Sequence, residues 1–249
     1  MLLIGGGILS IPKIIHYCWF GKEPKSELIR KCIRSWSVLE GYKIIEWNES
    51  NFNIESNPYV KEAYEKGKFA FVSDYVRLKV LYEFGGIYLD TDVEIKKNFN
   101  GFLENRLFMG FMFNCLLGTA VIGTEKKHPV IFDLLCLYSN MELKAVPNNN
   151  TFTEYFINNF SEFKLNNTLQ FLDKGVVIYP KEYFERPTYN RKLGYSIHHY
   201  TASWKNQQKK KKYLKVVLKS ILGDVLFSKL MHSIHVRKNS FYKLSLKQK

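Results

Sequence analysis

The sequence has little cysteine and no long apolar run. Its 249 residues include four cysteines, no two of which form a CxxC pair. All four have apolar neighbours, so we expect buried free thiols in a reducing compartment and no structural zinc site. No stretch reaches the roughly 18 apolar residues that a membrane-spanning helix needs, and residues 1–10 lack the basic start of a signal peptide. These absences predict a cytoplasmic protein in which residues 1–10 are an N-terminal extension.

Acidic side chains are almost missing from the last part of the chain. Residues 205–249 contain thirteen Lys or Arg residues and one acid, Asp224, so they carry a charge of +12 out of the net +14. A basic protein can bind nucleic acid through phosphate contacts. Here the charge is confined to one segment and no nucleic-acid motif accompanies it, so we expect no nucleic-acid partner.

The rest of the chain has the pattern of an α/β domain. Residues 11–20 and 42–47 are apolar and β-prone, and residues 26–39 between them have apolar side chains at helical spacing. This order favours a parallel strand pair. Further strands are expected within 87–89, 108–122 and 176–179, and further helices within 59–84, 129–138 and 152–160. The three asparagines 148–150 are expected to break the chain before the last of these helices.

Two aspartates follow a short apolar strand. Asp90 and Asp92 come directly after residues 87–89, and residues two apart in a strand point to the same face. Paired carboxylates suit Mg²⁺ or Mn²⁺, particularly when a diphosphate completes the coordination shell. Such a cation stabilises the charge of a departing diphosphate. The alternative is that Asp-Thr-Asp forms an ordinary turn.

A second pair of charged residues precedes this motif. Asp74 and Arg77 lie three apart in a helical stretch, so they share one face. Their apolar neighbours predict partial burial. The pair either holds a ribose and a phosphate or is a surface ion pair.

The order of these residues resembles a known enzyme family. Residues 69–94 read FAFVSDYVRLKVLYEFGGIYLDTDVE. This segment resembles the DXD-containing sugar-binding region of glycosyltransferase family 32, and it is similar to the catalytic domain of the large clostridial glucosylating toxins. The resemblance extends to IPKIIHYCWFG at 11–21, VIYP at 177–180 and HHYTASW at 198–204.

The resemblance implies a fold and an activity. Residues 11–204 are expected to form one GT-A-like α/β domain with a mixed, mainly parallel central sheet that binds a nucleotide sugar. The implied activity is retaining hexosyl transfer, with Mn²⁺ or Mg²⁺, from a donor that we expect to be a UDP-sugar. The implied acceptor is a hydroxyl of a glycan or lipid-linked oligosaccharide in surface (capsular) polysaccharide synthesis. The alternatives are a non-catalytic sugar-nucleotide binder and a basic nucleic-acid-binding protein.

The resemblance also implies roles for the donor-side residues. Trp19 would stack on the donor base, although it could equally be a core aromatic. Asp74 would contact ribose or sugar hydroxyls, and Arg77 would lie beside the donor sugar and phosphates. Asp90 would contact ribose and the metal site, and Asp92 would bind the metal directly.

Four later residues complete the implied site. Ser203 and Trp204 would close over the diphosphate and support the leaving group. They are adjacent here, whereas a residue separates them in the toxins, so their separate roles remain open. His198 or His199 would complete the metal shell. Neighbouring residues of an extended segment point to opposite faces, so at most one of them should reach the metal.

The basic C-terminal segment has a helical pattern of its own. Between residues 213 and 231, apolar side chains form one broad face and lysines lie opposite. A basic amphipathic helix of this kind lies on anionic membrane surfaces. The alternative is a helix that packs on the body. The first alternative predicts peripheral attachment to the inner face of the cell membrane.

Overall fold

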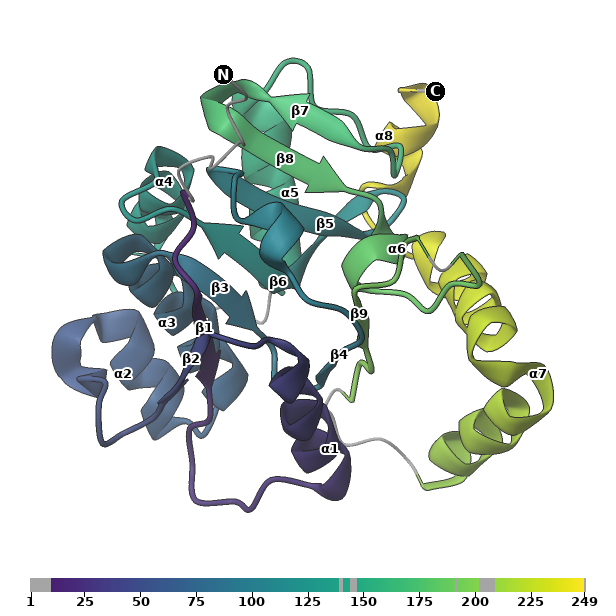
Figure 1. The fold of residues 1–249 in the computed structure, drawn as a ribbon, viewed down its shortest axis with the longest axis horizontal. Coiled ribbons are helices and arrows are strands. Elements are labelled where there is room, and N and C mark those ends of the chain that lie inside the picture. The colour runs from purple at the N-terminus through teal and green to yellow at the C-terminus, as the bar shows by residue number, and fades with distance from the viewer. Residues whose placement is uncertain (1–9, 139–140, 144–146, 191, 202–208, 249) are drawn as a thin grey trace, which may run out of the picture.

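A seven-stranded mixed sheet forms the centre of the protein. The computed structural model describes residues 10–138, 141–143, 147–190, 192–201 and 209–248 (Figure 1). The strand order is β2-β1-β3-β6-β5-β8-β7. Parallel pairs are β1 with β2, β1 with β3 and β5 with β8, and the other three pairs are antiparallel. The bounds are β1 Ile14–Cys18, β2 Lys43–Trp47, β3 Gly86–Leu89, β5 Leu107–Phe113, β6 Leu116–Thr124, β7 Gln170–Leu172 and β8 Val176–Tyr179. The expected α/β class with a mixed sheet is confirmed, but the sheet is not mainly parallel, because β6 and β7 each pair antiparallel with their neighbours.

Helices cover both faces of this sheet. Their bounds are α1 Glu27–Ser35, α2 Pro58–Glu65, α3 Phe69–Phe84, α4 Pro129–Leu137, α5 Asn148–Asn159, α6 Lys181–Phe184, α7 Lys209–Val236 and α8 Tyr242–Lys247. The larger core cluster joins α2 to α5 to one face. The smaller one, around Trp36, Phe102 and Phe184, fills the other face. Helix α3 is therefore buried along most of its length, which explains its apolar sequence.

A second, two-stranded sheet was not expected from the sequence. It pairs β4 (Val93–Ile95) with β9 (Ser196–His198) in antiparallel register, and Val93 lies opposite His198. The pairing brings two segments about a hundred residues apart together directly after the inner strand β3. It fixes the position of the residues that flank β4 and β9.

Two glycines join α3 directly to β3. Gly85 ends the helix, and its N–H donates to the Leu81 carbonyl. Gly85 and Gly86 have φ angles of +66° and +100°, which favour glycine. A Cβ on Gly86 would lie 2.6 Å from the Ile14 carbonyl oxygen. This turn sends the chain from α3 straight back along β3, so the end of β3 lies beside α3.

His16 is a core residue of β1 with both ring nitrogens satisfied. The Trp47 indole N–H donates to its Nδ1 at 3.0 Å, so Nε2 carries the proton and donates to the Gly85 carbonyl at 2.9 Å. Burial lowers the pKa of His16 to about 4. The neutral imidazole thus links β1, β2 and the α3–β3 turn and has a structural role.

Two expectations about local structure were wrong. The asparagines 148–150 form the first turn of α5 and do not break the chain. Their side chains explain this, because Asn149 donates to the Leu117 carbonyl and Asn148 accepts from the Thr119 hydroxyl, which ties the turn to β6. All four cysteines are free, but only three are buried, since Cys136 lies on the exposed side of α4.

The C-terminal segment is helical, as expected, and its end packs on the body. Helix α7 bends at Gly223, which has a φ of +71°. Val236 joins a small cluster with Phe113 and Leu116 of the sheet, and the Gln248 side chain accepts from the Leu165 N–H. In Figure 1, α8 lies close to β7 while α7 extends along the edge of the molecule. Within the part of the chain that the structure describes, no helix is both long and apolar enough to cross a membrane.

Candidate active site

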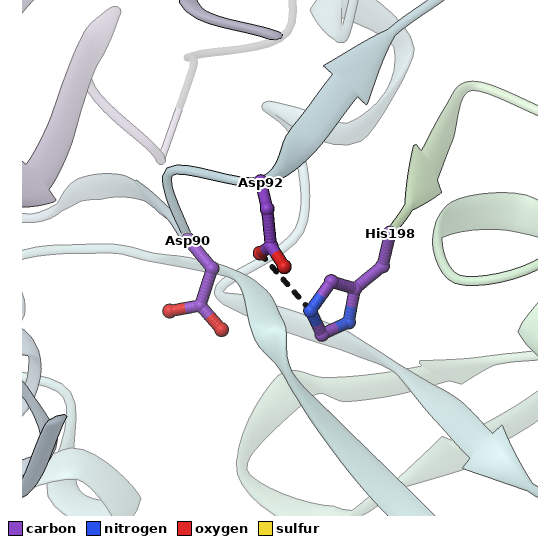
Figure 2. A group of neighbouring side chains, drawn as sticks. All are labelled: Asp90, Asp92 and His198. Atoms are coloured by element: carbon purple, nitrogen blue, oxygen red, sulfur yellow. Dashed lines mark ion pairs between the residues drawn. The ribbon is translucent and has the colours of Figure 1, made fainter. Parts of the chain in front are cut away.

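Asp90 and Asp92 lie in a tight turn between β3 and β4. The Asp90 N–H donates to the Ala120 carbonyl of β6, and the Val93 N–H donates back to the Asp90 carbonyl. The turn, rather than the alternation of a continuous strand, therefore brings the two carboxylates to the same side (Figure 2). The predicted proximity is correct, but its structural reason differs from the predicted one.

His198 completes a group of three potential metal ligands. One ligand atom from each of Asp90, Asp92 and His198 lies within 4.8 Å of the others. Figure 2 shows the His198 ring pointing from β9 toward the two carboxylates, with its Nε2 3.2 Å from Asp92 Oδ1. The side chain of His199, the residue after β9, is directed to Glu94 instead, and its Nε2 lies 2.9 Å from Glu94 Oε2. Of the two candidate histidines, the structure places only His198 with the aspartates.

Asp92 is held firmly in this turn. Its Oδ2 accepts from the N–H and the hydroxyl of Thr201, at 2.8 and 2.9 Å. Burial raises the pKa of Asp92, but the charge of His198 and these hydrogen bonds outweigh burial and hold the pKa well below its ordinary value. Asp92 is therefore an ionised carboxylate with one oxygen anchored to the protein.

Glu185 fixes the orientation of His198 from behind. Its Oε2 lies 2.8 Å from His198 Nδ1 and accepts from the Tyr200 hydroxyl at 2.7 Å. Glu185 is 2% exposed, and a Cβ on Gly118 would lie 2.3 Å from its Oε1. Burial lowers the pKa of His198, but the carboxylates of Asp92 and Glu185 outweigh it and raise the pKa well above its ordinary value. With Nδ1 committed to Glu185, only Nε2 of His198 faces the aspartates.

Arg77 connects α3 to the turn. Its Nη2 lies 3.1 Å from Asp74 Oδ1 and 3.2 Å from Asp90 Oδ1, and its Nη1 donates to the Thr119 carbonyl at 2.6 Å. The predicted burial of this pair is confirmed, because Arg77 is 5% and Asp74 9% exposed. Burial, only partly offset by Arg77, raises the pKa of Asp74 to about 7. Burial also raises the pKa of Asp90, against the effect of Arg77.

These residues line one cleft of about 1470 Å³. Trp19 belongs to the same lining, half-exposed, with its indole N–H bonded to the Glu23 carbonyl and Lys25 Nζ 5.1 Å from its ring. Helix α7 contributes Phe227, Met231 and His235. The predicted residues Ser203 and Trp204 lie outside the described residues.

Sequence reasoning missed several residues in and around this cleft. Glu185 lies behind His198 and outside the cleft lining, and it carries no local signal because it reaches His198 only through the packing of α6 beside β9. Thr201 lies within the segment HHYTASW, so a signal for it was present. Asn148 to Asn150 also line the cleft, although the sequence alone favoured an ordinary loop. Asn148 is 4% exposed, and its Nδ2 has no hydrogen-bond partner among the described residues.

Comparison with known proteins identifies the family. The sequence profile of the glycosyltransferase sugar-binding region containing the DXD motif matches residues 26–109. An uncharacterized glycosyltransferase of Acanthamoeba polyphaga mimivirus is 33% identical over 181 residues, which are 63% of this chain and 67% of the viral protein. The chain belongs to this family of DXD-motif glycosyltransferases.

Other members and structures are more distant from this glycosyltransferase chain. Inositol phosphoceramide mannosyltransferase 3 of Schizosaccharomyces pombe is 26% identical over 133 residues, which cover 51% of this chain and 36% of the yeast protein. The chain thus spans little more than a third of that relative. The solved structure of the PaToxG glycosyltransferase has a TM-score of 0.49 and 18% identity, over 59% of this chain and 69% of that chain.

The contact between Glu185 and His198 leads to a first prediction. Glu185→Gln is expected to weaken Mn²⁺ binding about 10- to 100-fold, because the neutral amide no longer fixes the orientation of the imidazole. Calorimetric titration of the full-length protein with Mn²⁺ measures the change in affinity. Glu104→Gln, an exposed position outside the cleft, is the matched control. Equal Mn²⁺ affinity in the two variants would show that Glu185 does not support metal binding by His198.

Proposed function

We propose that this protein is a metal-dependent glycosyltransferase that takes a hexose from a nucleotide sugar, preferably a UDP-sugar. The observation that carries the proposal is the group of Asp90, Asp92 and His198 in the wall of the large cleft. Arg77, bonded to Asp90, adds a buried positive charge directly beside this group. Membership of the DXD-motif family supports the same conclusion.

The three side chains fit a divalent cation. Two carboxylates and one imidazole form a mixed oxygen and nitrogen donor set, which favours Mn²⁺ and leaves Mg²⁺ as the alternative. A cation held by Asp90, Asp92 and His198 would supply positive charge that stabilises the leaving diphosphate. Asp92 would hold the cation most firmly, since its second oxygen is anchored by Thr201.

The surrounding residues would position the donor. Arg77 is fixed by Asp74 and the Thr119 carbonyl, so its charge needs no rearrangement when a phosphate arrives. Asp74, with a pKa of about 7, can donate or accept a hydrogen bond with a hydroxyl of the ribose or the sugar. Asn148 offers an amide N–H in the same lining that has no hydrogen-bond partner within the described ranges. Trp19 would stack on the base.

The carboxylates nearest to the DXD turn already contact arginine, lysine or histidine side chains. Asp74 and Asp90 contact Arg77, Glu94 contacts Lys96 and His199, and Glu185 contacts His198. Such carboxylates are poor covalent nucleophiles. We therefore favour front-side attack by the acceptor hydroxyl with retention of configuration. The bond from the sugar to the β-phosphate oxygen breaks as the new glycosidic bond forms, and a phosphate oxygen accepts the hydroxyl proton.

A donor panel tests the proposed activity. Full-length protein with Mn²⁺ is incubated with UDP-glucose, UDP-galactose, UDP-N-acetylglucosamine and GDP-mannose, and released nucleotide is scored. We expect slow release from one UDP-sugar and its suppression by EDTA. Metal-dependent nucleotide binding without release, with a range of glycan acceptors present, would favour the non-catalytic sugar-nucleotide binder.

Helix α7 supports a membrane-associated acceptor. Its outer face exposes Leu226, Leu230 and Ile234 at four-residue spacing, flanked by the cations Lys229 and Arg237. We propose that these three residues, termed the apolar ridge, rest on an anionic membrane surface and that the acceptor is a lipid-linked glycan of surface polysaccharide synthesis. The yeast relative, by its name, acts on a lipid, inositol phosphoceramide. This arrangement would place the protein at the inner face of the cell membrane.

Vesicle binding tests the proposed attachment. The full-length protein is expected to cosediment with vesicles that contain phosphatidylserine and to stay in solution with purely zwitterionic vesicles. Serine at all three positions of the apolar ridge should abolish cosedimentation, because the helix then buries no apolar surface in the membrane. Equal cosedimentation of this variant and the natural protein would contradict membrane attachment through the apolar ridge of α7.

A further inference from the structure

A second cavity lies between α7 and the loop that follows α6. Its volume is about 490 Å³, and it shares Arg186, Pro187 and Ser228 with the large cleft. The two hollows therefore adjoin, and Arg186 stands where they meet. The second cavity is termed the anion pocket, and its charged lining residues are Lys181, Glu182, Arg186 and Lys229.

The guanidinium of Arg186 has no anionic partner among the residues that the structure describes. Its Cζ lies 4.2 Å from the centre of the Tyr200 ring and 5.1 Å from that of Phe113, so two aromatic rings hold it. Its Nε is buried and has no hydrogen-bond partner among the described residues, and no ion pair to a described carboxylate forms. Arg186 as a whole is partly buried, and charged groups withdrawn from water are normally paired. Arginine is also the side chain best suited to phosphate. Arg186 is thus preorganised for an anion that comes from outside the chain.

The rest of the pocket adds to this positive charge. Lys181 contacts Glu182 at 3.0 Å and donates to Asn114, so these two charges compensate each other. Lys229 projects from α7 with no carboxylate partner among the described residues, which leaves the pocket with two uncompensated cations, Lys229 and Arg186. The Nδ1 of His232 is also buried there, and it has no hydrogen-bond partner in the part of the chain that the structure describes.

The position of the pocket indicates the carrier of the anion. Tyr189 at the pocket lining is 71% exposed, and aromatic side chains of this kind gather at membrane–water interfaces. Helix α7 lines the pocket with Ser228, Lys229 and His232, and the apolar ridge lies on the adjacent face of the same helix. An anion in the pocket would therefore sit next to an apolar surface.

We propose that the anion pocket binds the phosphate group of the lipid-borne acceptor, as a phosphomonoester or phosphodiester. This inference rests on the proposed transferase function and adds the acceptor's chemical class to it. The lipid chain lies along the apolar ridge, the phosphate contacts Arg186 and Lys229, and the glycan extends past Ser228 into the large cleft. The acceptor hydroxyl then approaches the donor from the α7 side of the cleft.

Three probes separate a lipid phosphate from other ligands. Full-length protein is titrated with dodecyl phosphate, dodecyl maltoside and inorganic phosphate, and binding is measured by calorimetry. The two dodecyl compounds are kept below their critical micelle concentrations. We expect dodecyl phosphate to bind at least about tenfold more tightly than either of the others. Equal binding of inorganic phosphate would overturn the lipid assignment, and equal binding of dodecyl maltoside would overturn the phosphate assignment.

Charge-removing variants locate the site. Lys229→Gln is expected to weaken dodecyl phosphate binding about tenfold, and Arg186→Gln more strongly, because each removes one phosphate contact. Arg186→Lys keeps the charge between the two rings and should lose less than Arg186→Gln. The matched control is Lys243→Gln, an exposed basic position outside the pocket and the cleft. Equal losses in Lys229→Gln and Lys243→Gln would mean general electrostatic attraction and overturn the pocket.

Nucleotide binding separates this inference from the function on which it rests. UDP with Mn²⁺ is titrated into the same proteins. Retained UDP binding by Lys229→Gln with weakened dodecyl phosphate binding supports the anion pocket. Retained UDP binding by the natural protein without any dodecyl phosphate binding overturns the pocket alone. Absence of metal-dependent UDP binding by the natural protein overturns the proposed function.

Discussion

Asp92→Asn is expected to lower the rate of sugar transfer about 10³-fold or more and to leave the fold intact. Asparagine keeps an oxygen that can accept from Thr201, so the turn between β3 and β4 should persist. It removes the charge that would bind the cation and that now faces His198. A loss of 10³-fold corresponds to about 4 kcal/mol of transition-state stabilisation, which is reasonable for the loss of a catalytic cation.

Turnover and the free energy of unfolding are measured on the same preparation of this variant. Asp173→Asn, an exposed aspartate outside the cleft, is the matched control and should keep full activity. Unchanged turnover in Asp92→Asn would exclude Asp92 as a metal ligand.

Arg77→Ala is expected to reduce the free energy of unfolding by about 3–5 kcal/mol as well as to abolish transfer. The guanidinium contacts two carboxylates and a carbonyl while only 5% exposed. Its removal leaves Asp74 and Asp90 buried without a compensating charge. Chemical denaturation measures the first effect, and turnover of the folded fraction measures the second.

Two further variants separate the structural and catalytic roles of Arg77. Asp74→Asn in the Arg77→Ala background should recover part of the stability, since it removes one of the uncompensated carboxylates. It should recover no activity. Arg77→Lys should fold but stay impaired, because a lysine cannot make the same three contacts from one planar group. Full activity in Arg77→Lys would show that the reaction needs only a positive charge at this position and not the guanidinium contacts.

The donor side of the site could be predicted because its determinants are local. Asp74 and Arg77 share a helix face through their three-residue spacing, and the glycine pair ends that helix directly before β3. A short segment of sequence thus contains the helix, the turn, the strand and the aspartates. The turn at Asp90 still escaped prediction, because a carbonyl of β6 fixes it and that strand follows 26 residues later.

The histidine side of the site could not be predicted in the same way. His198 reaches Asp92 only because β9 pairs with β4, and Glu185 reaches His198 only because α6 packs against the same sheet. Neither contact has a periodic signal in the sequence. Alternation along an extended segment did predict that at most one histidine of the pair would reach the metal site, but it could not say which one.

Helix α7 shows the same limit. Its apolar and basic pattern predicts a helix, yet the pattern does not tell which face meets the body, the cleft or the solvent. The structure assigns Val225 and Val236 to buried positions, Phe227 and Met231 to the cleft, and the apolar ridge to the exposed face. The sequence pattern alone therefore does not indicate the anion pocket, because the pocket depends on which side chains of α7 face the loop after α6.

The most direct test of the central claim is calorimetric titration of the full-length protein with UDP, first with Mn²⁺ and then with EDTA. If Asp90, Asp92 and His198 form a metal-dependent donor site, UDP should bind at least about tenfold more tightly with Mn²⁺, and Asp92→Asn should abolish the difference. Equal UDP affinity with Mn²⁺ and with EDTA in the natural protein would contradict the metal-dependent donor site.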